Sequence, residues 1–147
     1  MNFTSKLFEQ ITNTFYVISV FPNILIEMFL LALIMYSIYK LKLQNIVGSK
    51  YFWIFLLGFF LFPLFILFFG TEASNNHLPF DEHRSIFIQE TLFIHLFFAL
   101  NIVFVAFIIW NSKSVRLFYI SSSLLNLWIS LICWIFSLII SCNNIFI

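Results

Sequence analysis

Charged residues are scarce in this 147-residue chain, at 9%, while 63% of its residues are hydrophobic. Soluble domains average about 25% charged and about 45–50% apolar residues, so this composition places the chain in a lipid bilayer. The seven Lys and Arg residues are scattered and form no basic stripe that could neutralise a row of phosphates. We therefore exclude a nucleic-acid partner.

Cysteine and histidine are also few, at two and three residues, which limits metal and cofactor sites. Cys133 and Cys142 lie on one predicted helix about 13 Å apart along its axis, too far for a disulfide. The chain resembles small four-helix cytochrome b-type anchors, but bis-histidine haem ligation needs two intramembrane histidines and only His95 qualifies. His77 and His83, in a polar segment, make a poor preformed metal site. We expect no metal and no cofactor, and leave open a bound lipid such as cardiolipin.

Four long apolar runs predict four transmembrane helices, because about 20 apolar residues cross the hydrocarbon core. The predicted spans are residues 22–40, 51–69, 88–110 and 115–140, and a polar segment, residues 70–87, separates them into two hairpins. We expect one all-α integral membrane domain over residues 1–147. Its polar segment is predicted to be a loop on the outer side of the membrane.

Two further features refine this outline. Apolar residues at four-residue steps, from Phe3 to Phe15, predict a short helix in the membrane interface, with a frayed terminus as the alternative. Pro63 inside the second span predicts a kink near residues 59–63, because proline removes one backbone donor and crowds the carbonyl four residues earlier. Gly58, one turn before, is expected to ease that kink.

Basic residues are distributed unevenly between the two ends of the predicted spans. Five lie in the two short connections, namely Lys40, Lys42, Lys50, Lys113 and Arg116, against Lys6 and Arg84 on the opposite side. Because basic residues accumulate on the cytoplasmic or matrix side, the short connections are predicted to lie there. Both termini and the polar segment then lie on the outer side.

A stripe of small, weakly polar residues follows the fourth predicted span. Its members recur every three or four residues: Ser123, Asn126, Ser130, Cys133 and Ser137. Such a seam is typical of membrane helix packing, where close backbone approach and modest hydrogen bonds hold helices together. We expect it to pack against Thr91, Ala99 and Ala106 of the third span. Trp128 and Trp134 would then face lipid or a neighbouring subunit.

Glu27, His95 and Asn101 are the candidate intramembrane polar residues. Glu27 and His95 have matching depths on spans that we predict to be adjacent. A desolvated carboxylic acid beside a histidine can carry protons near neutral pH, and Asn101 is the one polar group that continues inward. The alternative interpretation is a structural pair that holds the helices in register or contacts another subunit.

The polar segment also contains a candidate docking site. Its residues are Asp81, Glu82, His83 and Arg84, which follow Pro79 and can start a short helix. We expect this site to bind neighbouring subunits on the outer side. The chain contains no Ser/His/Asp arrangement, Gly-rich phosphate cradle or paired membrane carboxylates, so we expect no enzymatic activity of the isolated chain.

Phenylalanine is unusually abundant, at 23 residues, beside only three glycines. This composition resembles that of small membrane proteins encoded in the AT-rich mitochondrial genomes of protists, ciliates especially; an AT-rich bacterium would show the same bias. The run FPNILIEMFLLALIMYSIYK is similar to the opening helix of the antiporter-like complex I subunits, where a proline and a carboxylate precede an apolar span. The Lys and Glu residues that carry proton translocation in those subunits have no counterpart here.

These resemblances imply a non-catalytic structural or assembly subunit of a respiratory, electron-transport complex in the mitochondrial inner membrane. Its partners would be the other membrane subunits and lipids. The alternative is a small transporter or proton or ion channel of a bacterial inner membrane that uses Glu27, His95 and Asn101.

Overall fold

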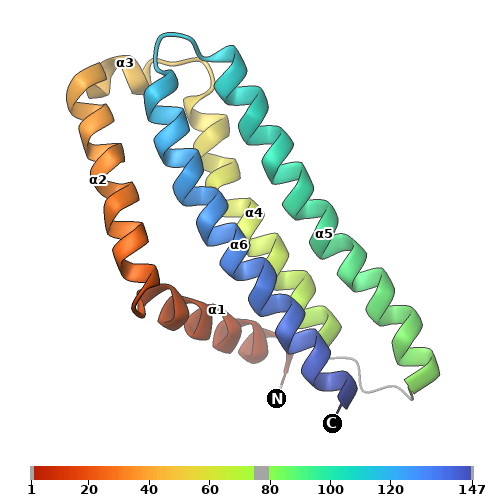
Figure 1. The fold of residues 1–147 in the computed structure, drawn as a ribbon. Coiled ribbons are helices and arrows are strands. Elements are labelled where there is room, and N and C mark those ends of the chain that lie inside the picture. The colour runs from red at the N-terminus through yellow and green to blue at the C-terminus, as the bar shows by residue number, and fades with distance from the viewer. Residues whose placement is uncertain (1, 75–79, 147) are drawn as a thin grey trace.

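The computed structural model describes the backbone of residues 2–74 and 80–146 and the side chains of residues 2–71 and 92–139. Its described elements are all helices: α1 (Phe3–Ser19), α2 (Asn23–Leu41), α3 (Leu43–Val47), α4 (Phe52–Ser74), α5 (Phe80–Asn111) and α6 (Arg116–Phe146). Figure 1 shows α2, α4, α5 and α6 as a bundle of long helices, with α1 lying across one end.

Four of these helices are long and apolar enough to cross a membrane. Their apolar parts are Asn23–Leu41, Phe52–Thr71, Leu92–Asn111 and Arg116–Ile139. The prediction of an all-α membrane protein with four transmembrane helices is confirmed. The start of α1, the end of α6 and the facing ends of α4 and α5 lie at the α1 end of the bundle, whereas α3 and the α5–α6 connection lie at the other end (Figure 1).

The predicted loop over residues 70–87 is wrong in extent. Helix α4 continues to Ser74 and helix α5 already begins at Phe80, so residues 70–74 and 80–87 are helical, and residues 75–79 lie outside the described residues. Polar residues alone do not stop a helix, and residues 70–74 contain no proline that would break the backbone ladder. The start of α5 directly after Pro79 agrees with the predicted helix start.

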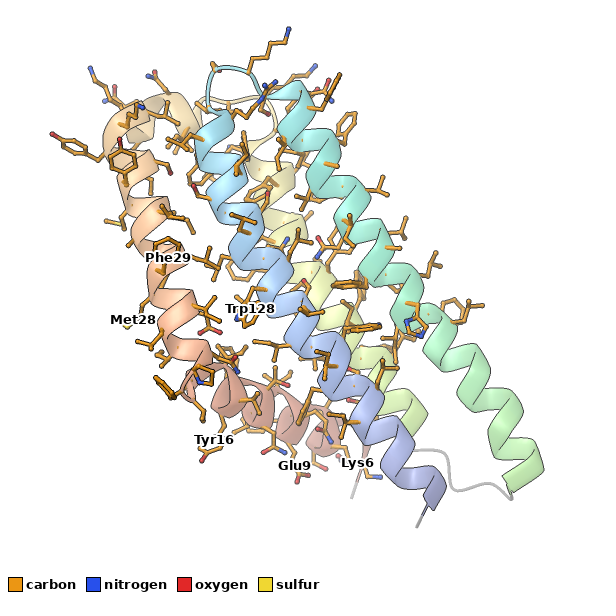
Figure 2. All side chains as sticks on the ribbon, in the orientation of Figure 1. Lys6, Glu9, Tyr16, Met28, Phe29 and Trp128 are labelled. Carbon is orange, nitrogen blue, oxygen red and sulfur yellow. The ribbon has the colours of Figure 1, made fainter. Side chains whose placement is uncertain are left out.

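Helix α1 confirms the predicted N-terminal helix and extends it to Ser19. Asn2 caps its first turn, because the Asn2 Oδ1 accepts a hydrogen bond from the Ser5 backbone N–H at 2.9 Å. Figure 2 shows Glu9 and Tyr16 pointing away from the bundle. The opposite face of α1 contacts α2, α4 and α6.

Helix α6 is the centre of the bundle. It packs against α2 on one side and against α4 and α5 on the other, while α2 packs on α6 rather than on α4, its neighbour in the chain (Figure 1). At the α3 end the core is a cluster of buried aromatic and aliphatic residues: Ile46, Phe55, Ile108, Val115, Phe118 and Tyr119. Tyr119 is also tied to the α3–α4 connection by a 2.7 Å hydrogen bond between its hydroxyl and that of Ser49.

Stacked phenylalanines join α4 to α5. The ring of Phe97 lies 5.1 Å from that of Phe65 and 5.3 Å from that of Phe69, and Phe69 also stacks on Phe93 at 5.1 Å. Offset aromatic pairs at such distances contribute about 0.5–1.5 kcal/mol each beyond the burial of their area. Part of the phenylalanine content therefore serves helix packing.

Gly58 has a role in the packing of α4 on α5. A side chain there would overlap the ring of Phe104 on α5, so the absence of a Cβ lets the two helices approach. Pro63 lies inside α4, which continues as a helix on both sides of it. The kink near residues 59–63 stays a prediction.

Candidate functional site

Three fully buried residues form a closed ring of hydrogen bonds between α5 and α6. Asn101 Nδ2 donates to Ser130 Oγ at 2.8 Å, Ser130 Oγ donates to Asn126 Oδ1 at 3.2 Å, and Asn126 Nδ2 donates to Asn101 Oδ1 at 3.2 Å. All three side chains are 0% exposed. Each residue donates once and accepts once within the ring, so the ring satisfies its own main hydrogen-bonding needs where hydrocarbon offers no water.

The rest of the small-residue seam packs mostly against α4. Ser137 Oγ donates to the backbone carbonyl of Ile66 at 3.2 Å, and a Cβ on Gly70 would collide with Ser137. Cys133, which is 1% exposed, packs in a cluster with Ile66 of α4 and Ile94 of α5. Ser123 is buried as well. The seam thus divides, with Asn126 and Ser130 facing α5 and Ser137 facing α4.

The predicted partner face of the seam on α5 is wrong. Ala99 and Ala106 are exposed, and the side chain of Thr91 lies outside the described residues. Helix α5 instead turns Ile94, Asn101 and Val105 inward. Burying Asn101 in its hydrogen-bonded ring leaves the small residues on the outer surface, where no close backbone approach is needed.

Glu27 is buried against a tryptophan of α6. Its side chain is 6% exposed and lies against the Trp128 indole, which Figure 2 shows between α2 and α6. No hydrogen bond of regular geometry forms between them, because Glu27 Oε1 and Trp128 Nε1 are both buried without a partner. A carboxyl group and an indole N–H that lack partners in an apolar setting carry an uncompensated desolvation cost.

His95 contacts a different tryptophan of α6. The Trp134 indole N–H donates to His95 Nδ1 at 2.9 Å, and the Trp134 ring stacks on Phe98 with the ring centres 5.5 Å apart. The His95 side chain is otherwise exposed on α5. Trp128 and Trp134 therefore each make a helix contact within the chain, which the sequence did not predict. Both side chains are only partly buried, so whether they also face lipid or a neighbouring subunit stays a prediction.

The expected neighbourhood of Glu27 and His95 is also wrong. Helix α6 lies between α2 and α5, and each residue contacts its own tryptophan on α6 (Figure 1). Asn126 and Trp128 are two positions apart on α6, so they leave the helix about 200° apart around its axis. The body of α6 consequently separates Glu27 from the Asn101 ring.

An apolar groove of about 400 Å³ runs along α6 between α2 and α5. Its lining residues come from these three helices: Leu30, Phe98, Ile102, Leu124, Leu127, Trp128 and Leu131. Glu27 lies one helical turn before Leu30 on the same face of α2. The unpaired polar atoms of Glu27 and Trp128 therefore lie beside this groove.

The predicted docking residues, Asp81 to Arg84, lie in the first two turns of α5, and their side chains fall outside the described residues. Within the part of the chain that is described, no group of three His, Cys, Asp or Glu residues could hold a metal ion. Comparison with family models, curated proteins and solved structures gives no match.

Sequence reasoning missed the two tryptophan contacts, although a signal for them exists. Membrane tryptophans concentrate at the two interfaces, whereas Trp128 and Trp134 lie well inside the span Arg116–Ile139. An indole N–H at such a depth needs an acceptor. Glu27 and His95 are the acceptor-bearing side chains that face these two donors.

Proposed function

We propose that this chain is a non-catalytic subunit of a larger membrane assembly, and that the α2–α6–α5 groove binds a transmembrane helix of another subunit. The observation that carries the proposal is the pair of buried, unpaired polar atoms, Glu27 Oε1 and Trp128 Nε1, beside that groove. A neighbouring helix that brings a hydroxyl, amide or basic side chain would supply the missing partners.

Exposed apolar side chains alone do not argue for a partner in a bilayer, because lipid tails are as apolar as leucine. Met28 and Phe29 on the outer face of α2, for example, are as well suited to lipid as to protein (Figure 2). A buried carboxyl group is different, since lipid chains offer it no hydrogen bond. A contact from another protein is the simplest way to satisfy it.

The polar residues inside the spans favour a structural role over transport. Asn101 is enclosed by Asn126 and Ser130, Glu27 lies on the far side of α6, and His95 is held by Trp134. A proton or ion path needs polar groups that follow one another across the membrane, and these three polar groups lie at separate places in the bundle.

The finer assignment is to a respiratory, electron-transport complex of the mitochondrial inner membrane. Its support is the phenylalanine-rich, glycine-poor composition, with 23 Phe and three Gly residues. In that membrane the α3 end, with Lys42, Lys50 and Lys113, would face the matrix, because basic connections stay on the side of synthesis. The residues that begin α5 would then dock on outer-side neighbours.

The size of the assembly tests this function. Native membranes are solubilised in a mild detergent, and the chain is followed by native electrophoresis and by mass spectrometry of the proteins that co-migrate. We expect the wild-type chain in a large complex and Glu27→Leu in a smaller one, with the exposed carboxylate variant Glu9→Leu unchanged. A stable small homo-oligomer that conducts protons or ions in liposomes would contradict the proposal and support a transporter.

A further inference from the structure

A cavity of about 250 Å³ lies under helix α1, between it and helices α4 and α6. Its walls are mainly apolar side chains of the three helices, among them Ile11 and Phe15 of α1, Phe60 and Leu64 of α4, and Ile129 of α6. The cavity is separate from the α2–α6–α5 groove, with which it shares no lining residue.

Short side chains make room for this cavity. Thr14 of α1, Pro63 of α4 and Cys133 of α6 all line it, one from each helix. Thr14 and Cys133 are small, and the proline ring is held close to its own backbone. The cavity therefore depends on the small size of the residues at these three positions. A larger residue at any of them would fill it.

The lining does not suit water. Thr14 Oγ1 already donates to the backbone carbonyl of Gln10 at 2.7 Å, and the Cys133 thiol is only a weak donor. A buried water needs two to four polar partners, whereas apolar cavities of roughly 150 Å³ take up benzene or xenon. A cavity of about 250 Å³ with this lining fits an apolar occupant.

The surroundings identify that occupant. The side chains of Phe15 and Phe60 are 65% and 60% exposed, so the cavity communicates with the outer surface of the bundle beside them. Phe60 and Leu64 belong to the membrane span Phe52–Thr71, so this surface faces the hydrocarbon of the bilayer. Acyl chains are the apolar molecules that reach it there.

We propose that one acyl chain of a membrane lipid binds in this cavity, between helix α1 and the α4–α6 pair. The chain fills the space that Thr14, Pro63 and Cys133 leave and joins α1 to the bundle through dispersion contacts. Helix α1 makes its contacts with α4 and α6 around this site. This inference is independent of whether the protein works within a larger assembly.

A photoreactive lipid tests the site. The purified chain is reconstituted in nanodiscs with phosphatidylcholine that carries a diazirine in the middle of one acyl chain, irradiated, and mapped by mass spectrometry. We expect adducts on the cavity wall at Ile129 and Cys133, besides those on exposed surfaces such as Met28 and Phe29. Labelling confined to exposed surfaces would overturn the proposal.

Two cavity-filling variants sharpen the test. Thr14→Phe fills the cavity from α1 and Cys133→Leu fills it from α6, and both are expected to lose the adduct at Ile129 while keeping those at Met28 and Phe29. Thr12→Phe is the matched control, because Thr12 is exposed on the same helix. Helix content and thermal melting identify folded variants. An adduct at Ile129 that persists in a folded filling variant would contradict the proposal; if neither variant folds, the wild-type map decides.

Discussion

Asn101 and Asn126 face each other across the α5–α6 interface, where Asn126 Nδ2 donates to Asn101 Oδ1 at 3.2 Å. Ser130 closes the ring by accepting from Asn101 and donating to Asn126. Hydrogen bonds in such a chain polarise one another, so the ring is expected to behave as one unit. It fixes both the depth and the rotation of α5 against α6.

The first prediction concerns this ring. Asn101→Leu leaves Asn126 Oδ1 supported but removes one donor and one acceptor from the ring, so we expect the variant to be less stable by about 1–3 kcal/mol. A double-mutant cycle between Asn101→Leu and Ser130→Ala should show a coupling of about 0.6–1.7 kcal/mol. Denaturant titration in detergent micelles measures both values. Asn45→Ala, at an exposed position, is the control, and additive effects within the ring would contradict this account.

The second prediction concerns the closest approach of α4 and α6. Gly70→Ala places a Cβ against Ser137, so the helices must move apart, at a cost of about 1–3 kcal/mol. Ser137→Gly in the same chain removes the obstructing side chain and should restore part of the lost stability. Ala106→Val adds methyl groups at an exposed position and should be neutral in the same unfolding assay. Equal stability of Gly70→Ala and the wild type would contradict the close contact between α4 and α6 at Gly70 and Ser137.

The third prediction concerns the α3 end. Tyr119→Phe keeps the ring in the core but loses the hydrogen bond to the Ser49 hydroxyl, so a loss of about 0.5–1.5 kcal/mol is expected. Ser49→Ala should cost a similar amount, and the double variant little more than either alone. Tyr39→Phe is the matched control, because Tyr39 is 86% exposed. Thermal melting in detergent checks the series; a fully additive double variant would show that the two hydroxyls do not interact.

The sequence predicted the number of membrane helices well, because the length of an apolar run directly reflects the thickness of the hydrocarbon it crosses. The depth of Glu27 and His95 below the ends of their predicted spans stays a prediction. The depth of a residue in the membrane, however, does not show which neighbouring helix that residue faces. Helices α2 and α5 are apolar on all sides. No hydrophobic stripe on them therefore indicates that α2 packs on α6 and not on α5.

The partners of the seam residues could not be predicted for a related reason. Small residues permit close approach but do not select a helix, and the large rings of Phe97 and Phe69 and the buried Asn101 decide how α5 turns. The limits of the polar segment were missed because polar composition marks exposure to water and not the end of a helix. Asp81 to Arg84 lie in α5, as the predicted helix start after Pro79 indicated, but that helix is the beginning of the third span and not a separate short one.

Cross-linking of cysteine pairs tests the central claim most directly, namely that α6 separates the intramembrane polar residues into independent contacts. In a background with Cys133 and Cys142 replaced by serine, Glu27→Cys is combined with Trp128→Cys, and His95→Cys with Trp134→Cys. A short bifunctional thiol reagent should join both pairs, because Glu27 contacts Trp128 between α2 and α6 and His95 contacts Trp134 between α5 and α6. The exchanged combination, Glu27→Cys with His95→Cys, should remain unlinked. Efficient cross-linking of the exchanged pair within one chain would contradict the account.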